Sequence, residues 1–203
     1  MNYQKKLDEI LEEIKGNKKI PTLLLHACCA PCASYVLEYL SKYFKITIYY
    51  YNPNIYPVDE YTRRINELKE FVKVFKAKNK ISFKEEEYKT QDYYKSVKGL
   101  EKLGERSERC YNCYKFRMEN SAIYAKESGF DYFTTTLSIS PYKNSNWINE
   151  IGALLEEKYG IKYLYSDFKK RDGYKRSLEL SKTYNLYRQS YCGCVYSKEE
   201  RLK

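Results

Sequence analysis

Short apolar runs alternate with longer segments of helical periodicity along most of this chain. The run at residues 21–26 is too short for a helix, and its apolar residues are continuous enough to be buried on both faces of a sheet. A helix is expected over 31–44, a strand over 46–51 and a second helix over 59–78. Strands joined by helices of this length need crossover connections, so the sequence predicts a mostly parallel sheet with helices on both faces.

The same alternation continues through the rest of the chain. Further strands are expected over 81–88, 131–137 and 161–165, and further helices over 91–100, 114–128, 147–159 and 174–184. The chain has 203 residues and no Pro-, Ser- or Gly-rich linker, so we expect a single α/β domain over 1–203 with four or five strands. Residues 1–19 are expected to form an N-terminal amphipathic helix with Leu7, Ile10, Leu11 and Ile14 on its apolar face.

Seven cysteines in three groups carry the chemistry that the sequence indicates. The groups are Cys28, Cys29 and Cys32; Cys110 and Cys113; and Cys192 and Cys194. The N-terminal segment resembles neither a signal peptide nor a membrane span, so we expect a cytoplasmic protein, and clustered thiols in a reducing compartment usually bind metals or perform redox reactions. The alternative, that these cysteines are small buried hydrophobic residues, explains a single cysteine better than three groups.

The first two groups have the positions and spacing of metal ligands. The sequence HACCAPC at 26–32 follows the first expected strand, at the edge of the sheet where α/β folds bind ligands. The N-terminus of the helix that follows stabilises negative charge, so it favours the thiolate form of these cysteines. Cys110 and Cys113 have CxxC spacing just before an expected helix, so their sulfurs can converge on one metal. Four thiolates from Cys28, Cys29 and this pair suit either a structural zinc or a 4Fe-4S cluster.

The third group is too closely spaced for an ordinary chelating pair. Cys192 and Cys194 in an extended chain would have Cα atoms about 6.6 Å apart, near the upper limit for a disulfide, and Gly193 gives the freedom to shorten that span. A bridge this local would be strained and easily reduced, which is typical of a catalytic disulfide. Two additional metal ligands are the alternative.

Two other side chains bear on the site. His26 is the only histidine, at the end of a buried strand, and is expected to be a satisfied residue near the core or a support to the metal site rather than a base. Asp131 is expected at a strand end, where a carboxylate could complete a second metal site.

The charge of the chain favours a polyanionic partner. There are 37 Lys and Arg residues against 27 Asp and Glu, a formal net charge of +10, and such a field attracts nucleic acid. The 25 tyrosines offer flat faces on which unstacked bases can lie. A charged surface that is merely solvated is the alternative.

Six sequence motifs together resemble the QueH-type epoxyqueuosine reductases. They are HACCAPC (26–32), YNPNIYP (51–57), ERCYNCYKFRM (108–118), DYFTTTLSISPYKN (131–144), SDFKKRDGYKRS (166–177) and YNLYRQSYCGC (184–194). The resemblance implies the last step of queuosine biosynthesis, a cobalamin-independent two-electron reduction of epoxyqueuosine at the wobble position of tRNA. It also implies a fold like the nucleotide-binding fold of the PP-loop (HUP) enzymes.

The same resemblance implies roles for individual residues. A 4Fe-4S cluster would be held by Cys28, Cys29, Cys110 and Cys113, and Cys192 and Cys194 would form a redox-active pair. Cys32 and Asp131 are candidates to hold an additional iron. Charge and position suggest that Arg188, Lys169, Lys170 and Tyr187, with Lys175 and Arg176, contact the tRNA. The electron donor is not identified by the sequence.

Two alternatives come from other classes of protein. An RNA thiolase of the same general fold would need an ATP-binding loop of SGGxDS type, whereas the first strand here ends in HACCAPC and the chain has only 8 glycines. A zinc-stabilised RNA-binding protein without redox chemistry would accommodate the charge and four thiolates. It would leave Cys192 and Cys194 without a role.

Overall fold

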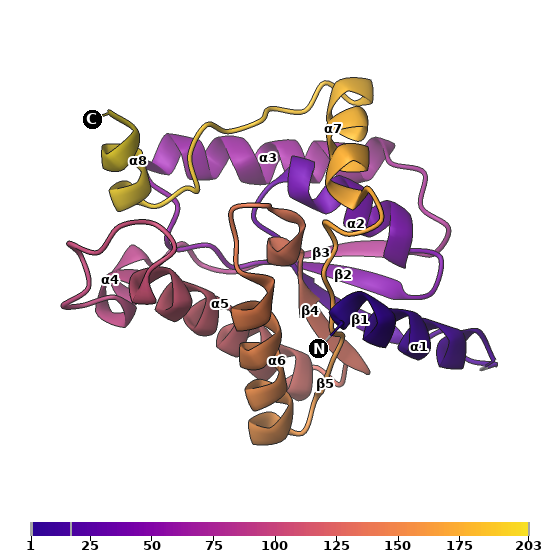
Figure 1. The fold of residues 1–203 in the computed structure, drawn as a ribbon. Helices are drawn as coiled ribbons and strands as arrows, with labels where there is room; N and C mark the ends of the chain where they lie inside the picture. The colour runs from indigo at the N-terminus through magenta and orange to yellow at the C-terminus, as the bar shows by residue number, and fades with distance from the viewer. Residues whose placement is uncertain (1, 17, 203) are drawn as a thin grey trace.

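A five-stranded parallel sheet forms the centre of the molecule (Figure 1). The computed structural model describes residues 2–16 and 18–202, and the strand order in the sheet is β3-β2-β1-β4-β5. The strands are β1 (Thr22–His26), β2 (Lys45–Tyr50), β3 (Ile81–Glu85), β4 (Tyr132–Thr135) and β5 (Lys162–Tyr163). The expected α/β fold, with a mostly parallel sheet of four or five strands, is confirmed.

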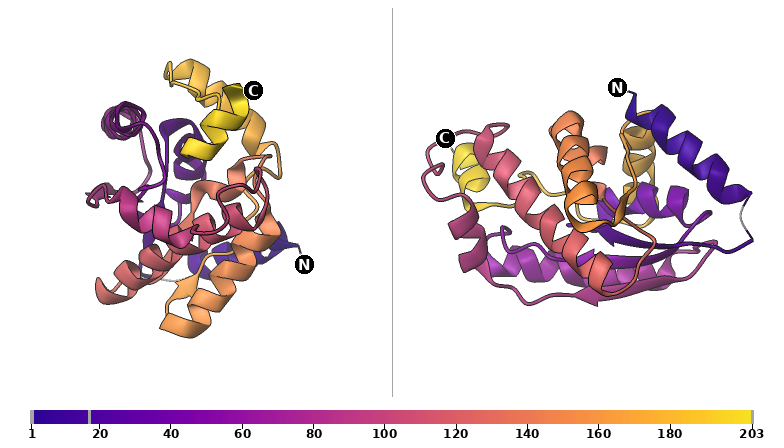
Figure 2. Two further views of the ribbon diagram at one scale, coloured as in Figure 1. Left: turned by 90° about the vertical axis from the view of Figure 1, so that its left-hand side faces the viewer. Right: turned by 90° about the horizontal axis from the view of Figure 1, so that it is seen from below.

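Helices connect the strands and cover both faces of the sheet (Figure 2). They are α1 (Tyr3–Lys15), α2 (Ala30–Leu40), α3 (Val58–Val74), α4 (Thr90–Ser96), α5 (Glu108–Glu127), the 3-10 helix η1 (Thr136–Ile139), α6 (Ser145–Tyr159), α7 (Gly173–Thr183) and α8 (Val195–Leu202). The helix predicted over 1–19 is α1; Met1 and Asn17, which that prediction included, lie outside the described residues. Within residues 2–16 and 18–202, every helix is too short or too polar to cross a lipid bilayer.

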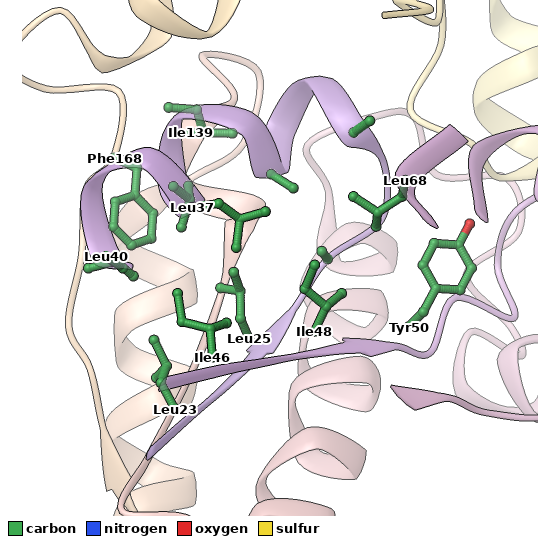
Figure 3. Packing of buried hydrophobic residues seen from close by; sticks show 14 of the residues in the cluster. Leu23, Leu25, Leu37, Leu40, Ile46, Ile48, Tyr50, Leu68, Ile139 and Phe168 are labelled. Atoms are coloured by element: carbon green, nitrogen blue, oxygen red, sulfur yellow. The ribbon is translucent and has the colours of Figure 1, made fainter. Parts of the chain in front are cut away.

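Alternation along the strands builds two separate layers of core. Leu23 and Leu25 point to the face covered by α2 and α3, where Figure 3 shows them with Leu37 and Leu68. Leu24 points to the opposite face, where α5 and α6 pack on the sheet. Because successive side chains of a strand alternate between faces, the apolar run in β1 is buried on both.

Two elements differ from the predictions. Helix α5 begins at Glu108 rather than near residue 114, so Cys110 and Cys113 lie in its first two turns instead of before it. Its early residues have no apolar periodicity, and Arg109 is buried between the Glu101 carbonyl and Glu200 of the C-terminal segment. Helix α8 was not predicted, since Ser197 is its only buried residue.

The strand order creates a crevice at one end of the sheet. The chain passes from β1 to β2 and β3 on one side, and then returns to place β4 on the other side of β1. The loops after β1 and β4 therefore leave the sheet in opposite directions, and α/β folds bind ligands at this point. Both loops carry residues of the candidate site.

Candidate metal centre and substrate pocket

The first cysteine group lies where β1 ends and α2 begins. The Sγ atoms of Cys28, Cys29 and Cys32 all lie within 4.8 Å of one another, and those of Cys28 and Cys29 are 3.8 Å apart. Cys29 is the N-cap of α2, and its carbonyl accepts a hydrogen bond from the Ala33 amide at 3.1 Å. Among the described residues, no other three His, Cys, Asp or Glu side chains bring ligand atoms this close together.

This group favours a thiolate at one position. The pKa of Cys28 is well below its ordinary value because hydrogen bonding with the Cys29 and Cys32 thiols stabilises its charged form, and the charges of Lys143 and Arg117 act in the same direction. The same interaction with Cys28 raises the pKa of Cys29 to about 12. Cysteine binds metals in its thiolate form, so this cysteine group is suited to bind a metal.

The second and third cysteine groups pack against each other. Cys110 and Cys113, in the first two turns of α5, line a small cavity together with Cys192 and Cys194, which precede α8. Burial raises the pKa of Cys113 to about 12, so this thiol stays neutral until a metal displaces its proton. The four predicted cluster ligands do not form one close group: Cys28 and Cys29 lie together with Cys32, and Cys110 and Cys113 are outside this group.

All three cysteine groups open on one pocket of about 310 Å³. Cys32, Cys110 and Cys192, one from each group, line it, and the loop after β4 supplies Lys143. Four tyrosines also line it, namely Tyr114, Tyr142, Tyr174 and Tyr191, together with Arg106, Arg188 and Arg201. A pocket with reactive sulfur on one side and aromatic and cationic groups around it can hold an anionic ligand that carries a flat ring.

Lys143 lines the same pocket as the cysteines and interacts electrostatically with them. Its half-buried side chain lines the pocket, and no ion pair is formed by it among the described residues. Burial alone would lower the pKa of this ammonium, but negative charge at Cys192 and Cys28 raises it above the ordinary value. Lys143 was missed from the sequence, although the position of its loop at the carboxyl end of β4 could have indicated it.

His26 has the structural role that was expected of it. It is fully buried, and its Nδ1 atom lies 2.9 Å from Thr135 Oγ1 while Nε2 lies 3.2 Å from the Tyr51 carbonyl oxygen. The carbonyl can only accept, so Nε2 carries the proton and Nδ1 accepts from the hydroxyl. Burial lowers the pKa of His26 to about 3, and the neutral ring has no nitrogen left for a metal.

Asp131 is at the wrong end of the sheet to hold an iron beside the cysteines. It precedes β4, and its carboxylate accepts hydrogen bonds from the Thr22 amide at 2.8 Å and the Thr22 hydroxyl at 2.9 Å. Thr22 begins β1, whereas the cysteines follow the end of that strand. The prediction of Asp131 as a metal ligand is therefore wrong, since it rested on a strand end without distinguishing which end.

The residues predicted to contact tRNA do not form one surface. Arg188 lines the pocket, where its Nη1 atom donates to Ser181 Oγ at 3.1 Å. Tyr187 lies outside the pocket lining, with its ring 3.4 Å from the guanidinium of Arg63. Lys169 and Lys170 line a separate groove beside the start of α1. Arg176 is paired with Glu38 and Glu179, and Lys175 lines none of these cavities.

Fold and site together define a class: a doubly wound α/β protein with a cysteine-lined pocket at the point where the strand order reverses. The family model for epoxyqueuosine reductase QueH matches residues 23–200. The epoxyqueuosine reductase QueH of Streptococcus pyogenes serotype M1 is 44% identical over 199 residues, 97% of this chain and 78% of the relative. That of Thermotoga maritima is 38% identical over 186 residues, 89% and 92% of the two chains. The chain belongs to the QueH family of epoxyqueuosine reductases.

A solved structure supports the fold independently. The U34-tRNA thiolase NcsA from Methanococcus maripaludis, solved with its 4Fe-4S cluster, matches with a TM-score of 0.50 and 14% sequence identity. The match covers 97% of this chain and 70% of the thiolase. The likeness concerns the fold, which is the nucleotide-binding type expected from the sequence.

Proposed function

We propose that this protein reduces epoxyqueuosine in tRNA to queuosine, the last step of queuosine biosynthesis, in the cytoplasm. The observation that carries the proposal is the single pocket lined by Cys32, Cys110 and Cys192, one cysteine from each group. Family membership names the substrate, and this pocket supplies thiol chemistry next to a space of about 310 Å³. That volume lies at the lower end of small-molecule sites and suits one extruded nucleotide rather than a whole loop.

The reaction requires electrons and protons in equal number. Removing the epoxide oxygen breaks two C–O bonds, forms one C=C bond and releases water, which consumes two electrons and two protons. Oxidation of two thiols to a disulfide releases two electrons and two protons. A dithiol can therefore balance one turnover, after which an external electron donor must restore it.

Cys192 and Cys194 are proposed as that dithiol, with different tasks for the two sulfurs. Cys192 is half-buried and lines the pocket, whereas Cys194 is buried behind it. The Ser197 amide donates to Cys194 Sγ at 3.4 Å, and Ser197 Oγ accepts from the Cys192 amide at 3.1 Å. The substrate or the external electron donor can therefore reach the sulfur of Cys192, and Cys194 forms the disulfide with it.

A 4Fe-4S cluster is proposed on Cys28, Cys29, Cys110 and Cys113. The donor set supports it, because Cys28 and Cys29 lie together beside Cys32 and Cys28 favours its thiolate form. Cys110 and Cys113 lie in the first two turns of α5, and Cys110 lines the same pocket as Cys32. When bound, such a cluster supplies one-electron transfer. An additional iron is proposed at Cys32, without Asp131.

The remaining residues are proposed to hold the tRNA. Arg188 and Lys143 face the pocket and can bind a phosphate or an oxygen of the extruded nucleotide, while Tyr142 at the exposed rim can stack on a base. Lys169 and Lys170, in the separate groove, would contact the tRNA backbone away from the reaction. The role predicted for Tyr187 in tRNA binding stays a prediction.

The proposal is tested by anaerobic purification followed by a turnover assay. Iron, acid-labile sulfide and zinc are quantified, and tRNA carrying epoxyqueuosine is incubated with protein and a chemical reductant. We expect about four irons and four sulfides per chain and a product nucleoside lighter by one oxygen atom. Zinc without iron, together with unchanged nucleoside, would instead support the zinc-stabilised RNA-binding protein.

A further inference from the structure

Three arginine side chains are almost completely buried, and they differ in how their charge is compensated. Arg64, Arg109 and Arg117 are 0%, 2% and 2% exposed. Arg64 Nε lies 2.7 Å from a carboxylate oxygen of Glu60, and Arg109 Nη2 lies 2.8 Å from one of Glu200. Arg117 forms no ion pair with any carboxylate of residues 2–16 and 18–202. A buried charge without a counter-ion is strongly unfavourable, so Arg117 requires an explanation.

The hydrogen bonds of Arg117 place its head between two cysteine groups. Its Nε atom donates to the Cys113 carbonyl at 3.3 Å, and Nη1 donates to Asn52 Oδ1 at 3.2 Å. Asn52 in turn donates to the carbonyl of Ala27, the residue before Cys28, at 2.8 Å. The Nη2 atom is buried and has no hydrogen-bond partner. An unsatisfied buried donor on a charged group points to a ligand that is negatively charged.

The thiols around Arg117 are the nearest source of negative charge. Burial alone would lower the pKa of the guanidinium, but charge at Cys113 and Cys28 raises it above the ordinary value. These two cysteines belong to different groups, and both are among the four proposed cluster ligands. A cluster bound by four thiolates is an anion, and its reduction potential depends on nearby charge and on hydrogen bonds to its sulfurs.

We propose that Arg117 is the counter-charge of the iron–sulfur centre, and that its unpaired Nη2 group donates to a sulfur of that centre. The inference rests on the proposed 4Fe-4S cluster. Arg117 is a positioning and tuning residue, since it is buried behind the pocket rather than in its lining. A positive charge stabilises the more negative, reduced state, so Arg117 raises the midpoint potential.

The test compares Arg117→Lys and Arg117→Gln with the wild-type protein. After anaerobic reconstitution, iron and sulfide are counted, and the midpoint potential is measured by a redox titration followed by electron paramagnetic resonance. We expect Arg117→Gln to change the reduction equilibrium at least tenfold, which is a shift of 59 mV to more negative potential. Arg117→Lys keeps the charge but loses the planar fork, so its shift should be smaller.

A double variant at an ion pair away from the cysteines is the control. Arg176→Met with Glu38→Gln removes one positive and one negative charge, and neither side chain lines the pocket or the cavity that the cysteines line, so the potential should stay at the wild-type value. Loss of iron from a folded Arg117→Gln protein that Arg117→Lys restores would also support the inference. Wild-type potentials in both Arg117 variants, or an equal loss of iron in both, would overturn it. Absence of iron from the wild-type protein would instead refute the proposed function.

Discussion

Gly193, between Cys192 and Cys194, has a backbone conformation that residues with a side chain rarely adopt. Its φ of 129° lies in the region that L-residues rarely adopt. A Cβ atom there would lie 3.0 Å from Arg64 Nη1 and 3.3 Å from Ile55 Cγ1. The carbonyl oxygen of Gly193 accepts from the Tyr56 amide at 2.7 Å, and Arg64 donates to the Cys192 carbonyl at 3.2 Å. The loop that aims Cys192 at the pocket therefore depends on glycine at its centre.

Gly193→Ala is expected to displace this loop and lower turnover at least tenfold. The strain at such a backbone position is about 1–3 kcal/mol, and a small misplacement of a reacting group is costly. Single-turnover reduction of epoxyqueuosine tRNA measures the effect. The control is Gly104→Ala, which has open space for a Cβ atom and an ordinary φ. Equal rates in the two variants would contradict the role given to the loop.

Lys143 is expected to act on the bound substrate rather than on the fold. Lys143→Met should lower kcat by about a hundredfold if Lys143 stabilises the oxygen that leaves, because the variant removes a charged donor from the pocket that holds the nucleotide. Lys143→Arg should recover part of the rate, since it keeps the charge. Steady-state kinetics with unchanged iron content measure both, and Lys76→Met, at an exposed lysine outside the pocket, is the control. If Lys143→Met raises only KM, the residue binds substrate without assisting the chemistry.

At the scale of the element, helix α8 is held on the start of α5 by a small polar network. Arg109 Nη2 pairs with Glu200, whose other carboxylate oxygen accepts from the Glu105 amide at 3.1 Å. The Ser197 hydroxyl donates to the Glu105 carboxylate. These contacts join two segments far apart in the chain, and they bring the pair Cys192 and Cys194 to the CxxC turn.

Glu200→Gln should loosen this attachment by leaving the buried Arg109 without a carboxylate. Because the side chain of Glu200 is 36% exposed, we expect a loss of about 1–3 kcal/mol, below the cost of breaking a fully buried pair. For a chain of this size each kcal/mol lowers Tm by about 2–4 °C. Thermal unfolding measures the change, and Glu199→Gln, an exposed residue with the same charge change, is the control. An equal Tm in both variants would exclude the network as an anchor of α8.

The sequence predicted strongly periodic elements better than those that depend on distant contacts. The first strand and the two helices that follow it were found because their apolar positions repeat regularly. The first turn of α5 was missed because its residues are polar, and Arg109 is buried through contacts outside the helix. For the same reason the sequence identified the cysteine groups but not the packing of the group Cys110 and Cys113 against the group Cys192 and Cys194. It also could not tell that Asp131 precedes its strand.

At the scale of the whole molecule, the topology explains how distant motifs form one site. Because β4 lies beside β1 and not beside β3, the start of α2, which carries Cys32, and the loop that carries Lys143 meet over the same end of the sheet. The segment after α7 then crosses this end and contributes Arg188 and Cys192. The order of the motifs along the sequence does not show that they come together at one site, because this depends on the order of the strands in the sheet.

The net charge of +10 belongs to the whole molecule, and it predicts how tRNA binding responds to salt. If cationic side chains displace counter-ions from phosphates, log Kd should rise linearly with log salt concentration, and each contact contributes about 0.7–0.9 to the slope. Arg188→Gln should therefore lower the slope by about 0.7, the value for a single strand, while Lys76→Met leaves it unchanged. Filter binding or fluorescence anisotropy at several salt concentrations measures both. A slope near zero for the wild-type protein would mean that its cationic surface is only solvated, and recognition would then depend on the tyrosines and the pocket alone.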